Sequence, residues 1–364
     1  MSTIVLSAGG TGGHLFPAQA LAGELLRRGR QIVVMTDQRG RHYDSVFPGA
    51  LIEQVPSATF VGSLLSRALA PLRIVAGILV SFFKLRRIRP SAVVGFGGYP
   101  SLPVLVAALM DGTPTAIHEQ NAVLGRVNRQ FADRVKAVAA SLPIARFAPM
   151  DLSRIVYTGN PVRPEAARLA AAAYEPSRNS GPIHLLVFGG SQGARALSEL
   201  VPAAIASLPA DLRARLSIVQ QCRPEDLEQV RAGYNSAGVT AELAAFFDDL
   251  PARMAAAHLV IARSGASTMA ELAVIGRPAI LIPFPFATDD HQTANAAVFA
   301  NADAAWLLPQ RDLSAESLAH LLENILRTPD ELQRRARAAL SLAKPDAAAR
   351  LADVIEKISR SEVA

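Results

Sequence analysis

The sequence predicts an α/β protein with two Rossmann-like domains, each built on a doubly wound parallel sheet, that face one another across a cleft. Three observations favour this fold class. The chain has 364 residues, more than a single hydrophobic core usually supports. Short apolar runs alternate with glycine-rich or polar turns and helical patterns, which is typical of βα repeats. The order of strand, glycine turn and helix that begins the chain begins again near its middle, at Ile183.

The first domain is predicted over residues 1–163. The turn G-G-T-G-G-H at 9–14 leads into an amphipathic helix over 17–28 that ends at Gly29. A second glycine turn at 97–101 precedes a helix through Met110, and a polar cluster at 118–121 precedes a helix from about Leu124. Glycine in such turns permits positive φ and close approach of a ligand. The expected strands cover 3–7, 32–35, 92–96, 115–117 and 155–157.

The second domain is predicted over residues 164–344. The segment T-G-N-P-V-R-P at 158–164 combines two prolines with Gly and Asn, which places the boundary near Pro164. A helix from about Arg195 follows the glycine turn at 189–194, and F-F-D-D-L at 246–250 leads from a strand end into a helix. The C-terminal helix, about 345–364, is expected to pack back on the first domain. The expected strands cover 183–188, 259–262, 278–283 and 304–308.

The stretch from His258 to Gln292 organises the second half. The strand over 259–262 runs into R-S-G-A-S-T and a helix, whose unpartnered N–H groups and positive dipole end suit a phosphate. Glu271 lies three residues after Thr268, the spacing of a capping box. Taken alone, the capping interpretation is preferred over one in which Glu271 holds sugar hydroxyls. The next loop carries D-D-H-Q at 289–292, and parallel strands bring both loops to the same edge of the sheet.

Composition narrows the class of protein. Half of the residues are hydrophobic, which argues against disorder. The lone cysteine, Cys222, excludes an intramolecular disulfide framework and is best interpreted as a small buried hydrophobe. The N-terminus lacks a basic segment ahead of its apolar run, so no secretory signal is expected. Residues 1–150 hold 16 Lys and Arg against 7 Asp and Glu, so the first half is basic. A basic half suits nucleic acid, an anionic membrane or a phosphorylated substrate.

The segment 59–90 is apolar and basic together. Its uncharged run over 74–83 is too short to span a membrane, which takes about 20 apolar residues. Cations around an apolar surface suit a protein that lies on an anionic bilayer. The alternative is a core helix with a solvated basic end, and both descriptions can hold for opposite faces. Nucleic acid fits less well, because no aromatic residues are interleaved with the cations. The predicted membrane patch consists of Leu72, Ile74, Ile78, Leu79, Phe82, Phe83, Lys84, Arg86, Arg87 and Arg89.

Other motifs leave alternatives open. G-G-S-Q-G at 189–193 fits the G-x-S-x-G nucleophile elbow, and Asp248 or Asp249 with His291 supplies the triad order of a serine hydrolase acting through Ser191. That interpretation leaves the glycine loops of the first half without a task. The first glycine turn matches a dinucleotide fingerprint weakly, because Leu15 stands at the third glycine position. Neither a metal-ligand cluster, a P-loop nor a D-x-D pair is present, so we expect no metal and no cofactor.

Seven motifs in their joint order give the chain a resemblance that spans nearly its whole length. They are G-G-T-G-G-H, G-F-G-G-Y-P at 95–100, H-E-Q-N at 118–121, G-N-P-V-R at 159–163, G-G-S-Q-G-A at 189–194, R-S-G-A-S-T at 263–268 and D-H-Q-T-A-N-A at 290–296. Together they resemble the MurG family, the bacterial undecaprenyldiphospho-muramoylpentapeptide β-N-acetylglucosaminyltransferases of glycosyltransferase family 28.

The resemblance implies a GT-B fold and an inverting, metal-independent transferase. Its donor would be UDP-N-acetylglucosamine (UDP-GlcNAc) and its acceptor lipid I, the undecaprenyl-diphospho-MurNAc-pentapeptide, whose muramoyl 4-hydroxyl would take the sugar to give lipid II for peptidoglycan. It also implies peripheral attachment to the cytoplasmic face of the inner membrane and cell-wall and division proteins as partners, without nucleic acid. A non-catalytic protein that binds nucleotide sugars is the remaining alternative, because binding residues alone do not prove turnover.

Residue roles carry over from the matching motifs. Glu271 and Gln292 would bind the sugar, Ser191 and Arg163 the diphosphate, and the backbone at Phe247 the uracil. One departure affects the sugar contacts, because Thr293 follows Gln292 where some members carry a second glutamine. The implied donor site comprises Thr11, Gly12, Gly13, Asn121, Arg163, Ser191, Phe247, Arg263, Ser264, Gly265, Ala266, Ser267, Thr268, Glu271 and Gln292. The implied acceptor loops contain Gly10, Gly97, Gly98 and Tyr99.

Transfer to a hydroxyl requires a stabilised UDP leaving group and a base for the attacking hydroxyl. A helix dipole, Ser191 and Arg163 are expected to supply the first. His14 is the candidate base, because it follows Gly13 at the expected cleft and an imidazole titrates near neutral pH. A structural hydrogen bond at the helix start is the alternative role for His14, and Glu119 is the rival base.

Overall fold

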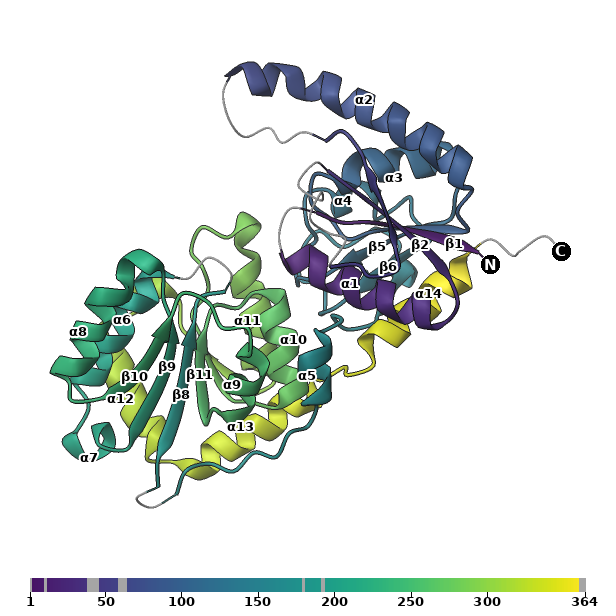
Figure 1. The fold of residues 1–364 in the computed structure, drawn as a ribbon. Coiled ribbons are helices and arrows are strands. Elements are labelled where there is room, and N and C mark those ends of the chain that lie inside the picture. Colours follow the sequence, from purple (N-terminus) through teal and green to yellow (C-terminus); the bar gives the residue numbers. More distant parts are fainter. Residues whose placement is uncertain are drawn as a thin grey trace. The chain divides into compact units, whose positions relative to one another are not determined.

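The computed structural model describes residues 2–9, 12–37, 46–57, 64–178, 181–190 and 194–359, with only the backbone described for 64–69. The chain divides into two compact units, drawn in Figure 1. The first consists of residues 1–163 and 344–364, and the second of residues 164–343. Each unit is built around its own parallel sheet.

The first unit holds a seven-stranded sheet in the order β3-β2-β1-β4-β5-β6-β7. Every pair is parallel, and the order reverses direction at β1, as expected for a doubly wound sheet. The strands are β1 (Thr3–Ser7), β2 (Gln31–Thr36), β3 (Leu51–Gln54), β4 (Ala92–Gly95), β5 (Thr115–Glu119), β6 (Ala137–Ala140) and β7 (Ile155–Tyr157). The helices are α1 (Gly12–Arg27), α2 (Leu64–Ile88), α3 (Ser101–Met110), α4 (Asn128–Phe131) and α14 (Ala347–Ile358).

Side-chain alternation along the strands assigns these helices to the two faces of the sheet. Ile4 lies in a core cluster with residues of α1 and α14, whereas Val5 packs with residues of α2 and α3. The strand register places Ile117 on the same face as Val5, and Ile117 packs under α4. One face is therefore covered by α1 and α14, and the other by α2, α3 and α4 (Figure 1).

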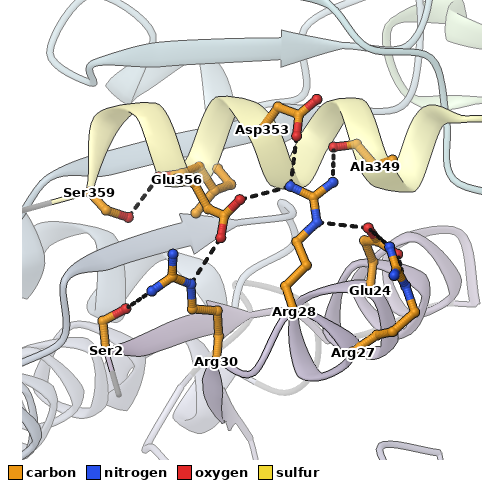
Figure 2. A network of polar contacts seen from close by, with 10 residues as sticks. Ser2, Glu24, Arg27, Arg28, Arg30, Ala349, Asp353, Glu356 and Ser359 are labelled. Carbon is orange, nitrogen blue, oxygen red and sulfur yellow. Dashed lines mark hydrogen bonds and ion pairs between the residues drawn. The ribbon is translucent and has the colours of Figure 1, made fainter.

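The C-terminal helix α14 is fixed to α1 by a polar network at the end of α1 (Figure 2). The Arg28 guanidinium donates to Glu24 at 2.7 Å, to Asp353 at 2.6 Å and to Glu356 at 2.7 Å. Arg30 donates to the second carboxylate oxygen of Glu356 at 2.9 Å. Beneath this network α14 contributes Leu351, Ala352 and Ile355, all fully buried, to the core of the first unit.

The second unit holds a six-stranded sheet in the order β10-β9-β8-β11-β12-β13. Its topology repeats that of the first unit from β8 onward, and its pairs are also parallel. The strands are β8 (Ile183–Phe188), β9 (Leu216–Gln221), β10 (Thr240–Ala244), β11 (Leu259–Ala262), β12 (Ala279–Leu281) and β13 (Ala305–Leu307). The helices are α5 (Pro164–Arg168), α6 (Arg195–Ala206), α7 (Ala210–Arg213), α8 (Leu227–Ser236), α9 (Leu250–Ala256), α10 (Ala266–Ile275), α11 (His291–Asn301), α12 (Ala315–Leu326) and α13 (Pro329–Ser341).

Several predicted boundaries are wrong. The first helix begins at Gly12, not at residue 17, so the glycine turn supplies its first residues and Pro17 lies inside it. The helix expected from Leu124 is limited to Asn128–Phe131, because residues 121–127 fold around a buried carboxylate instead. Cys222 is buried and free, which confirms its interpretation as a small hydrophobe.

Candidate functional site

The N-terminus of α10 is open in the second unit. Gly265 is its N-cap residue, has an extended backbone (φ −66°, ψ 148°) and has no side chain to cap the helix. The first N–H groups of α10 therefore point toward the edge of the sheet without a capping side chain. This is the arrangement in which a helix receives an anion.

The β11–α10 and β12–α11 loops are tied together beside this helix. The Ser264 hydroxyl donates to the Gln292 carbonyl at 2.8 Å, and the Asn295 side chain donates to the Ser264 carbonyl at 3.0 Å. Gln292 in turn accepts from the Phe284 N–H at 2.9 Å through its side-chain oxygen. The side-chain NH₂ of Gln292 takes no part in these three hydrogen bonds, so the oxygen of the amide fixes the loop and its nitrogen can bind a ligand.

Arg263 supports the same edge of the second sheet through buried hydrogen bonds. Its guanidinium is buried and donates to the carbonyls of Ile282 and Pro283, each at 2.9 Å, and to the side chain of Gln310 at 2.7 Å. Burial lowers the pKa of this guanidinium from its ordinary value. Arg263 therefore shapes the loop after β12 in this structure, and its predicted contact with the donor remains a prediction.

The capping box predicted from Thr268 and Glu271 is wrong. The helix begins two residues before Thr268, at Ala266, so Thr268 lies inside its first turn and is not the N-cap residue. Glu271 is buried in the same helix. The Ser267 hydroxyl oxygen is also buried, and no hydrogen-bond partner for it exists among the described residues. A buried hydroxyl at an open helix N-terminus is a group that a ligand oxygen can satisfy.

The predicted uracil-contacting residue lies between β10 and α9. Phe247 is buried, and the guanidinium carbon of Arg253 lies 4.2 Å from its ring centroid. Arg253 also donates to Asp249 at 2.7 Å. Asp249, one of the two candidate aspartates of a serine-hydrolase triad, is therefore paired with an arginine. The candidate histidine of that triad, His291, has its Nδ1 2.8 Å from the Thr288 carbonyl. Neither interaction joins the carboxylate to the imidazole.

In the first unit, His14 lies against the second glycine turn. A Cβ atom added at Gly97 would lie 3.3 Å from Nε2 of His14, and one added at Gly98 would lie 3.6 Å from Nδ1. Both glycines have positive φ, 89° and 76°, so a side chain there would meet strain as well as the imidazole. The glycine turn therefore leaves room for the ring of His14 at the carboxyl ends of β1 and β4.

Glu119, the rival base, is buried at the end of β5 and accepts four hydrogen bonds. One carboxylate oxygen accepts from the N–H and the side chain of Asn121, at 3.0 and 3.3 Å. The other accepts from the Gly125 N–H at 2.8 Å and from the Asn128 side chain at 2.9 Å. Burial raises the pKa of this carboxyl, which these four donors oppose.

His118 precedes Glu119 and is fully buried. Its Nδ1 accepts from the Gln120 side chain at 3.0 Å, and its Nε2 lies 3.3 Å from the Gly159 carbonyl. Burial lowers the pKa of His118 to about 4, so the ring is neutral at physiological pH. His118 is thus a structural histidine, and the role of His14 as the base remains a prediction.

The remaining predicted site residues either belong to the described part of the first unit or lie outside the described residues. Arg163 belongs to the first unit, where its guanidinium carbon lies 5.5 Å from the ring centroid of Phe16. Gly12 and Gly13 form the first residues of α1, and Tyr99 is half-buried beside Gly98. The predictions at Gly10, Thr11 and Ser191 lie outside the described residues.

The residues of the predicted membrane patch lie along α2 and directly after it, and they differ in exposure. Leu72 and Phe83 are 68% and 69% exposed, and Leu79 is also exposed. Ile74, Ile78 and Phe82 are half-buried, and Phe82 packs on the core with Ile88. One face of this helix therefore packs on the core and the opposite face is exposed, and contact of that exposed face with a membrane remains a prediction. Of the patch cations, Arg86, Arg87 and Arg89 are exposed, whereas half-buried Lys84 pairs with Glu53. None of the helices in the described ranges is long and apolar enough to cross a membrane.

The sequence analysis gives no role to three residues that build the site, although one of them, Asn295, lies in the D-H-Q-T-A-N-A motif. Asn128 links Glu119 to the His118 carbonyl, and buried Asn295 links the two loops of the second unit. Gln310 supports Arg263. For Asn128 and Gln310 the only available signal is a lone polar residue outside any motif, which is weak. Val75 was likewise omitted from the α2 patch, although it is exposed.

Two Rossmann-like units, each built on a parallel sheet whose strand order reverses at its first strand, define an enzyme of the GT-B architecture. Two family models match the sequence, the glycosyltransferase family 28 N-terminal domain over residues 4–140 and the C-terminal domain over residues 184–351. The chain belongs to glycosyltransferase family 28.

Relatives of nearly equal length carry one name, UDP-N-acetylglucosamine–N-acetylmuramyl-(pentapeptide) pyrophosphoryl-undecaprenol N-acetylglucosamine transferase. The protein of Rhodospirillum centenum is 51% identical over 356 residues, covering 98% of this chain and 94% of the relative. That of Chelativorans sp. is 51% identical over 362 residues, covering 99% and 96%. The crystal structure of Acinetobacter baumannii MurG is 31% identical, with a TM-score of 0.81 over 98% of this chain and 100% of that one.

Proposed function

We propose that this protein transfers N-acetylglucosamine from UDP-GlcNAc to the muramoyl 4-hydroxyl of lipid I, with inversion at the anomeric carbon, and so forms lipid II for peptidoglycan. The observation that carries this proposal is the near-full-length identity of about half to relatives named for this transfer. The family models cover both units, so the likeness is not confined to one nucleotide-binding module.

The donor is assigned to the edge of the second unit. Its diphosphate would accept hydrogen bonds from the open N-terminus of α10, and the Ser267 hydroxyl would gain a partner. Glu271, Gln292 and the backbone at Phe247 are proposed to hold the sugar and the uracil. Fixed N–H groups stabilise the UDP leaving group without reorganisation during the reaction.

The base is assigned to His14 in the first unit. A general base must reach the hydroxyl that it deprotonates, and the oxygens of Glu119 are already occupied by four donors. The imidazole of His14 lies in the first turn of α1 beside the Gly97–Gly98 turn, where the acceptor diphosphate is also proposed to bind. Glu119 is proposed to position the 120–128 loop.

The acceptor carries a polyprenyl chain, so its enzyme must reach a bilayer. The exposed apolar face of α2, with Arg86, Arg87 and Arg89 nearby, supports peripheral attachment to the cytoplasmic face of the inner membrane. The protein is expected to pellet with anionic vesicles, and less so in high salt. Equal binding to neutral vesicles at any salt would contradict this attachment.

Metal independence is part of the proposal. Within the described ranges, His, Cys, Asp and Glu side chains nowhere gather in threes that could hold a metal ion. Excess EDTA is expected to leave the transfer rate unchanged, and restoration of a lost rate by a divalent cation would overturn this part of the proposal.

Release of UDP from UDP-GlcNAc on addition of a lipid I analogue tests the activity. The expected result is stoichiometric UDP and a disaccharide product, with slow release when the acceptor is omitted. Tight binding of UDP-GlcNAc without acceptor-dependent release would identify a binding protein instead. Reaction of Ser191 with a serine-directed phosphonate would favour the hydrolase.

A further inference from the structure

The connection between β6 and β7, residues 141–154, exposes three large apolar side chains that the proposed reaction does not use. Phe147 is 48% exposed, Met150 89% and Leu152 63%. Single exposed apolar residues are common on protein surfaces. Three of them occur here within six residues, and a gathering of exposed apolar side chains usually marks a contact surface. We call residues 141–154 the β6–β7 loop.

This loop is held firmly in its exposed position. The Ala145 N–H donates to the Ala122 carbonyl at 2.6 Å, and the Leu124 N–H donates to the Arg146 carbonyl at 3.2 Å. The Met150 N–H donates to the Asp133 carboxylate at 2.6 Å. These hydrogen bonds fix the backbone on both sides of Phe147. The apolar side chains are therefore exposed in a defined loop conformation.

Phe147 is held in a strained backbone conformation. Its φ of 63° lies in the left-handed region, which a bulky residue rarely occupies. The guanidinium carbon of Arg129 lies 3.8 Å from its ring centroid, while Arg129 donates to the Leu124 carbonyl at 2.9 Å. Strain of this kind persists only where the surroundings impose it, and it is concentrated at functional positions.

Basic residues outnumber acidic ones in the part of the chain that contains the loop. Residues 122–154 contain six Arg and Lys against two aspartates. Asp133 binds the Met150 N–H, and Asp151 accepts from the Ser153 N–H at 3.0 Å, so both acids are engaged within the loop structure. The exposed cations are Arg126, Arg134, Lys136 and Arg146. An apolar patch with cations at its border complements an anionic lipid surface.

The loop lies on the same side of the sheet as α2. Ile144 and Ile155, near its two ends, pack on the core cluster that contains Ile117. Ile117 and Val5 share a face of the sheet, and Val5 packs in the cluster with α2. A bilayer is an extended plane, so it can meet two separate surfaces of one helical layer at once.

We propose that the β6–β7 loop is a second membrane-contacting surface, which inserts Phe147, Met150 and Leu152 among anionic lipids while α2 binds the same bilayer. This inference rests on the proposed membrane attachment and adds a second contact to it. Two separated contacts fix the orientation of the first unit on the bilayer, whereas α2 alone would leave it free to rotate about one helix.

A fluorescent label tests insertion directly. Met150→Cys places an environment-sensitive dye at the loop, and the native thiol of Cys222 is buried and should remain unlabelled. With vesicles of phosphatidylglycerol and phosphatidylcholine, we expect quenching by bromine atoms on the lipid acyl chains. Leu79→Cys on α2 is the positive control, and Arg337→Cys on exposed α13 is the negative one. Quenching at position 79 but not at position 150 would overturn the proposal.

Binding variants provide a second test. Met150→Ser with Leu152→Ser is expected to lower the vesicle partition constant about tenfold or more. Arg134→Glu with Lys136→Glu is expected to lower it about fivefold or more for each charge removed. Arg311→Glu with Arg337→Glu is the matched charge control in the second unit. Phe147→Asn relieves the left-handed strain, so it should weaken vesicle binding without lowering thermal stability. A purely structural role would predict the opposite.

The outcomes separate this inference from the attachment on which it depends. Loss of binding in Leu79→Ser and Phe83→Ser variants, with full binding by all loop variants, would overturn the second surface and keep the first. A wild-type protein that binds no anionic vesicle would overturn both. If the loop is instead an interface with a second copy of the chain, light scattering will show a dimer without lipid that the Met150→Ser and Leu152→Ser changes dissociate.

Discussion

The side-chain amide of Asn128 donates to a carboxylate oxygen of Glu119 over 2.9 Å, and the Gly125 N–H donates to the same oxygen at 2.8 Å. With Asn121 on the other oxygen, the carboxylate has four donors, about the number that it can accept. The loop between β5 and α4 is thus wrapped around one buried carboxyl group. This relationship supports the proposal that Glu119 positions the loop and that another group takes the proton.

Glu119→Gln is expected to loosen this loop. The new NH₂ group would face the N–H donors of Asn121 or Gly125, and a lost charged hydrogen bond costs about 2–3 kcal/mol. Hydrogen exchange at the Gly125 N–H should accelerate, and transfer activity should fall with it. Gln130→Ala, at an exposed position on α4, is the control. Undiminished protection of Gly125 together with lost activity would point back to Glu119 as the base.

His14→Ala is expected to lower kcat by about 10²–10⁴, the usual contribution of a general base, with a small change in the KM for UDP-GlcNAc. The variant should also lose the acidic limb of the pH–rate profile, since that limb reports protonation of the base. Steady-state kinetics against pH measures both effects, with exposed His320→Ala as the control. An unchanged kcat would remove His14 from the chemistry.

Substitutions of two serines near the N-terminus of α10 should change ligand affinity and protein stability independently. The Ser267 hydroxyl is buried without a partner, so Ser267→Ala should change the free energy of unfolding by less than about 0.5 kcal/mol and raise the Kd for UDP-GlcNAc about tenfold. Ser264→Ala removes the 2.8 Å bond to the Gln292 carbonyl and should lower stability by about 1 kcal/mol. Calorimetric titration and chemical denaturation report the two quantities. Equal effects of both changes would contradict this division.

The sequence predicted the strands better than the loops. Strands 3–7, 155–157, 183–188 and 259–262 match the structure residue for residue, because continuous apolar runs between turn residues have few alternatives. The strands β3, β6 and β9 are absent from the prediction. Ala137–Ala140 is short and alanine-rich, and alanine favours helix, so only its position between β5 and β7 makes it a strand.

The sequence predicts which loops form the candidate site, but it does not predict the contacts that their side chains make. Strand order and glycine turns locate the loops, since both follow from local sequence. What each side chain does depends on residues far along the chain. Arg263 reaches Gln310 across 47 positions, which no local pattern encodes. Thr268 and Glu271 show the converse error, because capping-box spacing was present but the helix begins earlier.

The buried histidine His118 predicts a pH dependence of stability. Burial lowers its pKa from 6.5 to about 4, so the folded first unit favours the neutral ring. Between these two values the unfolded chain binds more protons than the folded one. The part of the free energy of unfolding that depends on the neutral ring is therefore fully present above pH 6.5. It is lost as the pH falls toward 4, and the loss is about 3 kcal/mol.

Hydrogen exchange in β5 and β6 measures this loss in the first unit, and NMR titration of the ring measures the pKa itself. The fluorescence of Trp306, the sole tryptophan, reports the second unit and serves as the internal control. His118→Gln should be less stable at neutral pH, because it disrupts the contacts with Gln120 and Gly159, and should show a flatter dependence on pH. A ring pKa near 6.5 in the folded protein is incompatible with this account.

Leu351→Ala tests whether α14 is an integral part of the first unit. Leu351 is fully buried against residues of α1 and the sheet, and removing a buried leucine side chain costs about 2–5 kcal/mol. The cost should fall on the first unit alone, because its core contains α14 although 180 residues of the second unit separate this helix from β7 and α1 in the sequence. Lys357→Ala, exposed on the same helix, should change stability little.

Denaturation followed by hydrogen exchange in β1 and by Trp306 fluorescence resolves the two units. Loss of stability at β1 with an unchanged tryptophan transition is the expected result. Arg28→Ala should act in the same direction but by less, about 1 kcal/mol, since its ion pairs to Asp353 and Glu356 are partly exposed and screened by salt. If Leu351→Ala shifts the tryptophan transition as far as the β1 protection, α14 stabilises both units and its assignment to the first unit alone is wrong.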